Sequence, residues 1–139
     1  MDVLITDKIA QRHTENTVVL EWHNRYDKSN NISINNYLDD NSIKVRDLYL
    51  EYIHKIGHDE IRNNSLVKKL HYKDNFSFWW LNLVSEKSPF KSKRIFEALR
   101  VISVFEIIKD LKPEFVHLDI NDHSIRKCFE NNFKLNNTK

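Results

Sequence analysis

Glycine is the residue that this chain lacks most clearly, because Gly57 is its one copy in 139 residues. A glycine-rich phosphate loop and a Gly-x-Gly-x-x-Gly dinucleotide fingerprint both need several glycines at fixed spacing, so both are excluded. Proline occurs twice and cysteine once, as Cys128. One cysteine excludes an intramolecular disulfide and favours a reducing compartment. The composition also excludes collagen-like and proline-rich proteins.

Long apolar runs and an excess of one charge are missing as well. No stretch approaches the roughly 18 consecutive apolar residues of a membrane-spanning helix, and the N-terminus lacks the pattern of a secretory signal. The 22 basic and 20 acidic residues leave a formal net charge of +2. Nucleic-acid-binding domains carry a stronger basic excess, so no nucleic-acid partner is expected; the basic cluster in residues 87–94 keeps that function as a minor alternative. We expect a cytoplasmic protein without a transmembrane segment, able to lie at the inner face of the membrane.

Three apolar or β-branched runs predict strands, at residues 2–7, 17–22 and 114–120. Turn-forming residues between 23 and 42 predict a long loop with one helical turn near Tyr37. Apolar residues three and four apart predict five helices. These helices are expected at residues 43–56 with a C-terminal cap at Gly57, at 64–72, from 76 to about Ser88-Pro89, at 93–112 and at 125–133. Strands that alternate with long helices predict an α/β fold with a parallel sheet, as a single domain over residues 1–139.

The loop after the second predicted strand is the best ligand site by position. Open α/β sheets bind ligands just beyond the C-terminal ends of their strands. In the stretch Trp22–Asp27, His23 is a candidate general base and Arg25 a candidate phosphate clamp. The alternative is a solvated loop without function, and the sequence favours neither.

The stretch "LDINDHS" follows the third predicted strand. Asp119, Asp122 and His123 have the chemistry to bind a metal or ribose hydroxyls. The simpler interpretation, which we prefer, is that Asp122 or Asn121 caps the last helix, because Asp is expected at a helix start without any chemistry.

Metal and thiol chemistry are not expected. His54 and His58 have the spacing of two ligands on one helix face, but Lys55 stands where a zinc-protease motif has glutamate. Because no third ligand is identifiable, we predict no metal site, and no cofactor is expected. Cys128 follows Ile125 by three residues on a helix and is expected to be a small buried hydrophobe.

The run "NFSFWWLNLVSEKSPFKS" concentrates aromatic residues. Trp79 and Trp80 would suit stacking on a sugar face, but aromatic groups at helical spacing usually pack, so we expect both in the core. Trp80 in particular shares an apolar stripe with Phe76. Glu86 and Lys87 end the run, either as favourable charges at a helix terminus, which we prefer, or as contacts to a ligand.

This run also carries a family resemblance. It is similar to bacterial surface-carbohydrate (capsule and O-antigen) biosynthesis proteins of a glycosyltransferase-like family. The matching residues are Phe78, Trp79, Trp80, Leu81, Glu86, Lys87, Ser88 and Pro89, followed by Leu99 and Glu106 in the next predicted helix.

The resemblance implies a partial Rossmann-like domain of the glycosyltransferase-B N-terminal type, with a short parallel sheet and several helices. Family members are several times longer, so the chain would be an N-terminal part of that architecture, on the acceptor side. The implied partners are a glycan or lipid-linked glycan acceptor and a nucleotide sugar. The expected ligand contacts are His23, Arg25, Glu86 and Lys87, and no catalytic residue of the family maps onto the chain. Whether this chain alone is an enzyme stays open, and the alternative is a non-catalytic module that binds a partner protein.

Overall fold

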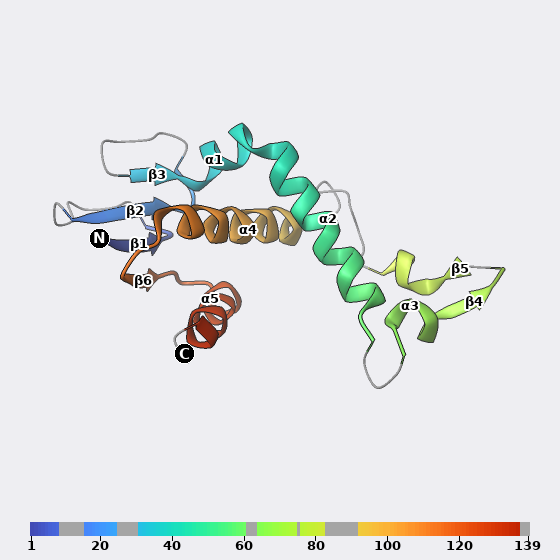
Figure 1. The fold of residues 1–139 in the computed structure, drawn as a ribbon. Helices are drawn as coiled ribbons and strands as arrows, with labels where there is room; N and C mark the ends of the chain where they lie inside the picture. Colours follow the sequence, from blue (N-terminus) through green and yellow to red (C-terminus); the bar gives the residue numbers. More distant parts are fainter. Residues whose placement is uncertain (9–15, 25–30, 61–63, 75, 83–91, 137–139) are drawn as a thin grey trace. The chain divides into compact units, whose positions relative to one another are not determined.

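The computed structural model describes residues 1–8, 16–24, 31–60, 64–74, 76–82 and 92–136, with side chains as far as Phe133 (Figure 1). The chain divides into two compact units. Unit 1 comprises Met1–Asn41 and Ser103–Lys139, and unit 2 comprises Ser42–Ile102. The elements in chain order are β1 (Asp2–Thr6), β2 (Thr17–Glu21), β3 (Asn31–Ser33), α1 (Ile34–Asp40), α2 (Ser42–His58), α3 (Leu66–Lys69), β4 (His71–Lys73), β5 (Phe76–Ser77), the 3-10 turn η1 (Phe78–Leu81), α4 (Lys93–Leu111), β6 (Phe115–Asp119) and α5 (His123–Asn136).

Unit 1 is built on a four-stranded parallel sheet with the strand order β3-β2-β1-β6. Strand β1 lies inside the sheet and pairs along its whole length with β2 on one side and β6 on the other. The three predicted strands are therefore confirmed, and so is the α/β class with a short parallel sheet and several helices. The order is that of a partial Rossmann-like sheet, with β6 in the place of the fourth strand.

The core of unit 1 is closed by aromatic contacts between helices and sheet. Phe105 on α4 packs against Phe129 and Phe133 on α5, with ring centroids 5.4 and 5.8 Å apart. Trp22, directly after β2, meets the ring of Phe129 edge-on at 6.1 Å. These contacts join α5 to both α4 and the end of β2. The buried apolar side chains of the unit are Val3, Ile5, Val19, Leu20, Trp22, Ile34, Val104, Ile107, Ile120, Ile125 and Phe129.

The long loop predicted between residues 23 and 42 is wrong where β3 forms, whereas the helical turn predicted near Tyr37 is confirmed as part of α1. Strand β3 pairs with β2, and α1 follows at once and includes Tyr37. A three-residue strand is too short to show an alternating pattern, and a tertiary contact secures it: Asn31 Nδ2 donates to the buried carboxylate of Glu21 at 2.8 Å. Ser33 then begins α1, because its Oγ accepts from the backbone N–H of Asn36 at 3.2 Å.

Unit 2 packs around Trp79, which is 3% exposed. The indole shares its core with Tyr49 and Ile53 of α2 and with Ile95 of α4. The predicted cap at Gly57 is wrong, because α2 continues to His58 and Gly57 is buried inside it. A Cβ at position 57 would stand 2.5 Å from Trp79 Nε1 and 2.8 Å from Cε2. Glycine is needed here because the indole lies directly on the helix backbone.

The helix predicted to begin at Phe76 does not form in the described residues. Strand β5 pairs antiparallel with β4, and η1 is a single 3-10 turn. The cause is Ser77, which is buried: its Oγ donates to the carbonyl of Val67 at 2.8 Å and accepts from the N–H of Trp79 at 3.2 Å. The predicted end near Ser88-Pro89 lies outside the described residues.

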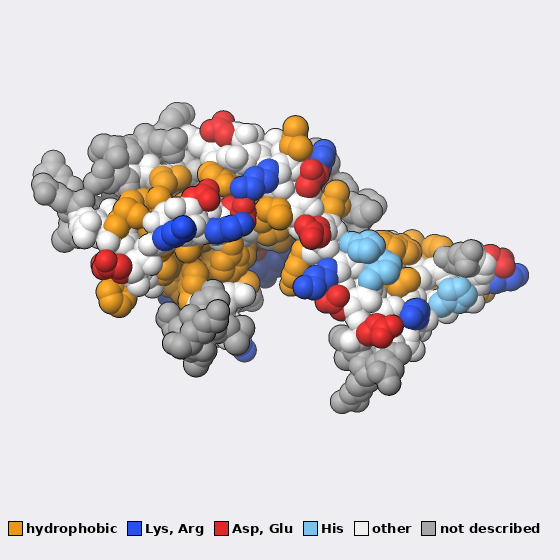
Figure 2. All heavy atoms as spheres, viewed as in Figure 1, with side chains coloured by type: hydrophobic (Ala, Val, Ile, Leu, Met, Phe, Trp, Pro, Cys, Tyr) orange, Lys and Arg blue, Asp and Glu red, His pale blue; other side chains and the backbone are white. Residues whose placement is uncertain are grey.

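The surface carries charges of both signs. Figure 2 shows Lys and Arg side chains interspersed with Asp and Glu on the viewed face, as the nearly balanced composition implies. None of the helices in the described part of the chain combines the length and the apolar character that crossing a bilayer demands.

Substitution of the buried glycine tests the packing of unit 2. In an exposed helix position Gly→Ala stabilises by up to about 1 kcal/mol, whereas overpacking a core costs about 1–3 kcal/mol. We expect Gly57→Ala to lower the free energy of unfolding, measured by urea denaturation, because the new methyl group meets Trp79.

The matched control is the same change in a Trp79→Phe background, where the smaller ring leaves room for the methyl group. There Gly57→Ala should be neutral or stabilising. Equal effects in both backgrounds would contradict the contact between Gly57 and the indole.

Candidate functional site

The parallel sheet brings the carboxyl ends of β1, β2 and β6 to one edge. They end in one register row, in which Thr6 pairs with Glu21 on one side and with Asp119 on the other. Strands β2 and β3 lie on one side of β1. The chain then passes through α1 to α4, and β6 lies on the opposite side of β1. The point between β1 and β6 is thus a topological switch point, outside which open α/β sheets bind their ligands.

Polar side chains gather at this point and hold one another in place. We call Asp7, Lys8, Asp119, Asn121 and Asp122 the switch-point cluster. The carboxylate of Asp7 accepts from the backbone N–H of Asn121 at 2.7 Å and from its Nδ2 at 3.1 Å. Lys8 Nζ lies 2.5 Å from Asp119 Oδ1, and both side chains are about half exposed. Segments more than 100 residues apart in sequence therefore present fixed polar groups to solvent.

Helix α5 starts at the cluster. Asp122 Oδ1 accepts from the backbone N–H groups of Ser124 and Ile125 at 2.8 and 3.1 Å, which confirms the predicted cap. His123 is exposed at the first position of the helix. Within the described residues, no three His, Cys, Asp or Glu side chains are arranged to hold a metal ion.

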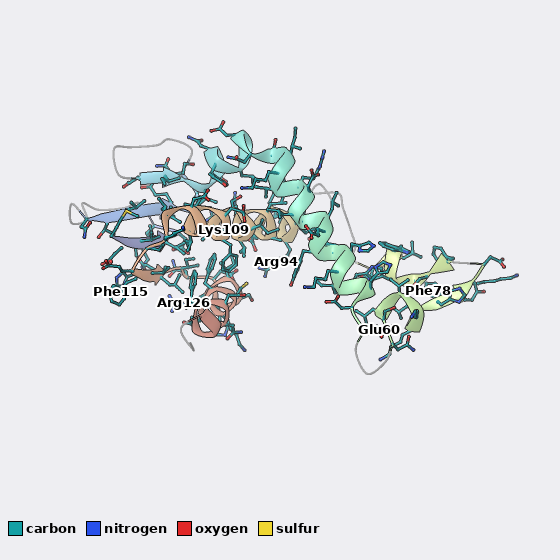
Figure 3. All side chains as sticks on the ribbon, in the orientation of Figure 1. Glu60, Phe78, Arg94, Lys109, Phe115 and Arg126 are labelled. Carbon is teal, nitrogen blue, oxygen red and sulfur yellow. The ribbon has the colours of Figure 1, made fainter. Side chains whose placement is uncertain are left out.

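Two nearby cations, Lys8 and Arg126, help to lower the pKa of Asp119. The hydrogen bond from Lys8 is the main cause that lowers the pKa of Asp119; partial desolvation opposes it, and the Thr6 hydroxyl and the charge of Arg126 lower it further. Arg126 is the fourth residue of α5 (Figure 3). Its Nε is buried and has no hydrogen-bond partner among the described residues. A buried donor without a partner is costly, so an acceptor that reaches Nε would be bound favourably.

A second polar network holds the end of β2. Glu21 is 2% exposed, and its carboxylate accepts from Nδ2 of Asn31 and of Asn24. The carbonyl of Asn24 in turn accepts from Ser33 Oγ at 2.5 Å and from Asn35 Nδ2 at 3.1 Å. The start of the loop after β2 is therefore tied to β3 and α1, which positions the segment that carries His23.

The structure places only some of the residues predicted from the sequence to contact ligand. His23 is exposed after β2, at the same edge of the sheet as the switch-point cluster. Trp79 is in the core as predicted, but the same prediction is wrong for Trp80, which is 40% exposed, because the 3-10 turn replaces the expected helix. Arg25, Glu86, Lys87, Ser88 and Pro89 lie outside the described residues.

The two histidines of α2 contact each other. The rings of His54 and His58 stack with centroids 3.9 Å apart, and His58 Nδ1 lies 2.9 Å from the carbonyl of His54. Histidine side chains gather over the end of α2 in Figure 2. Cys128 is half-buried, and this burial raises the pKa of its thiol.

Sequence reasoning missed Asp7, Lys8 and Glu21 as parts of a site. Asp7 and Lys8 directly follow one apolar strand, and Asp122 and His123 come shortly after another, so polar residues after both strands were the available signal. Glu21 had no comparable signal, because its partners come from a segment without a clear pattern.

Titration of Asp119 tests the cluster. Because its pKa is lowered in the folded protein, the favourable contact to Lys8 is present at neutral pH and is lost as the pH falls through that pKa. By carboxyl ¹³C NMR we expect Asp119 to titrate below the ordinary range of aspartate. Lys8→Met should raise the midpoint, and Lys109→Met should leave it unchanged, since Lys109 lies beside Glu106. An unchanged midpoint in Lys8→Met would contradict the contact.

Comparison with known proteins identifies no relative. No family model matches the chain, and no curated protein or solved structure matches it either.

Proposed function

We propose that unit 1 binds the glycan acceptor of a glycosyltransferase-like protein in surface-carbohydrate assembly. The binding site in this proposal is the carboxyl edge of the parallel sheet. One observation carries the proposal: Asp7 directly follows β1, Asp119 ends the neighbouring β6, and both are fixed at the topological switch point by hydrogen bonds. The similarity of the stretch from Phe78 to Pro89 to surface-carbohydrate proteins supports the substrate class.

The charge of the site favours a neutral, hydroxyl-rich ligand. Carboxylates accept hydrogen bonds from sugar hydroxyls, and such charge-assisted bonds are stronger than neutral ones. Asp7, Asp119 and Asp122 stand against the cations Lys8 and Arg126. A nucleoside diphosphate is negatively charged, so the excess of carboxylates would repel it. The site therefore suits the acceptor better than the donor of a sugar transfer.

In such a transfer an acceptor hydroxyl attacks the anomeric carbon of the donor sugar, and the nucleoside diphosphate leaves with the bonding electron pair. The hydroxyl proton passes to a base. The lowered pKa of Asp119 makes it a weak base at neutral pH. In this proposal Asp119 orients the acceptor by hydrogen bonds. No residue is proposed as the catalytic base.

A module that binds a partner protein is the second candidate function. Strand β6 is at the edge of the sheet, and Phe115 on it is 64% exposed. An open edge invites pairing with another strand. In this function Phe115 is a contact residue, and the switch-point cluster serves only to join β1 to β6.

The proposal is tested by NMR titration of the full chain with neutral di- and trisaccharides and, separately, with UDP-glucose. We expect saturable shifts at Asp7, Lys8 and Asn121 with a saccharide and none with the nucleotide sugar. Hydrogen bonds to charged groups contribute about 1.5–3 kcal/mol, so Asp119→Asn should weaken saccharide binding about tenfold or more.

Glu114→Gln is the matched control. It removes a carboxylate at the opposite end of β6, where Glu114 lies 3.9 Å from the N-terminal amine, and it should leave saccharide binding unchanged. Binding of UDP-glucose without saccharide binding, or equal saccharide affinity of Asp119→Asn and the unmodified chain, would contradict the proposal. Circular dichroism establishes that both variants stay folded.

A further inference from the structure

Unit 2 exposes several large apolar side chains on the segment from α3 to η1. We call its side chains the aromatic hairpin face; each is at least 39% exposed, and they are Leu70, Tyr72, Phe76, Phe78, Trp80 and Leu81. Phe78 contacts Tyr72 and Phe76, with ring centroids 5.3 and 5.8 Å apart. Single exposed apolar residues are ordinary, whereas a contiguous group marks an interaction surface.

The local fold holds these rings outward. Residues alternate from Phe76 to Trp80: Ser77 and Trp79 are buried, and the three aromatic residues between and beside them are exposed. Ser77 is anchored to Val67, and the N–H of Phe78 donates to the carbonyl of Leu70 at 2.9 Å. These hydrogen bonds hold the backbone that carries the exposed rings. Phe78 is labelled in Figure 3.

Three exposed lysines lie in the same segment as the aromatic hairpin face. Lys68, Lys69 and Lys73 are exposed, and Asp74 is the one acidic residue between Leu66 and Asn82. Lys68 lies 3.4 Å from Glu60, an ion pair in which both side chains are mostly exposed. Positive charges beside apolar groups complement an anionic phospholipid surface, which attracts lysine with about 1 kcal/mol per residue.

A lipid surface fits this face better than a protein or a sugar does. Lysine is depleted in the cores of protein interfaces. A sugar stacks on an open flat ring, but Phe78 is tilted by 57° against Tyr72 and meets Phe76 edge-on. Leu70 and Leu81 add aliphatic surface that forms no hydrogen bonds to a glycan. Aromatic rings and lysines together are typical of the membrane–water interface.

We infer that the aromatic hairpin face docks unit 2 on an anionic phospholipid bilayer. The rings enter the interfacial region, and Lys68, Lys69 and Lys73 contact the head groups. The docking is peripheral. It depends on residues of unit 2 alone and is independent of glycan binding by unit 1.

Vesicle binding of the full chain tests the inference. We expect cosedimentation with phosphatidylglycerol–phosphatidylcholine vesicles and at least tenfold weaker binding to phosphatidylcholine alone. Of the three tryptophans, Trp22 and Trp79 are buried and Trp80 is exposed. Brominated lipid should therefore quench the fluorescence of the unmodified chain, and Trp80→Phe should lose most of this quenching.

Two variants address the two parts of the surface. Phe76→Ser combined with Phe78→Ser should weaken binding at least tenfold. Replacement of Lys68, Lys69 and Lys73 by Gln should weaken it similarly and remove its dependence on salt. Tyr52→Ser is the control, because it removes an exposed aromatic residue of α2 that is not part of the aromatic hairpin face, and it should bind like the unmodified chain.

Three outcomes would overturn the inference. The first is no binding of the folded chain to phosphatidylglycerol vesicles, and the second is unchanged binding by the lysine variant. The third is a loss in Tyr52→Ser as large as that in the double Phe variant, which would indicate non-specific adsorption. Because the assay contains no sugar, its result is separate from that of the saccharide titration.

Discussion

Unit 1 depends on one constraint: β1 has to pair with two strands at once, and all three have to end in the same register row. Because the row is shared, the residues that follow β1 and β6 meet at one edge. The hydrogen bonds from Asn121 to Asp7 and the contact of Lys8 with Asp119 exist only in this register. A slip of one residue would turn every side chain of the strand to the opposite face and remove the cluster. The stability of the sheet and the geometry of the candidate site therefore have the same origin.

Unit 2 buries one large ring, that of Trp79, and exposes the residues on either side of it, Phe78 and Trp80. The indole of Trp79 fits because Gly57 removes the side chain that would occupy its place. Ser77 fixes the backbone on either side, so that Phe78 and Trp80 face outward. The same short segment thus supplies the centre of a core and an exposed surface.

Strong apolar periodicity made much of this fold predictable. The strands β1, β2 and β6 and the long helix α4 follow from the local pattern of apolar and β-branched residues. Tertiary contacts decided the rest. The pairing of β3 relies on Asn31 and Glu21, and Ser77 overrides a helical spacing of aromatic residues. At the candidate site the residues after the third strand were foreseen by position, but their contact with Asp7 and Lys8 depends on a register that no local pattern contains.

The division of the chain also shapes the order in which it can fold. Unit 2 is continuous in sequence, whereas unit 1 joins two segments on either side of it. The pairing of β1 with β6 closes a loop of more than 100 residues, and the entropy lost in such a closure slows folding. When unit 2 is compact, the effective length of that loop is smaller. Early folding of the inserted segment therefore lowers the kinetic barrier to completing the sheet.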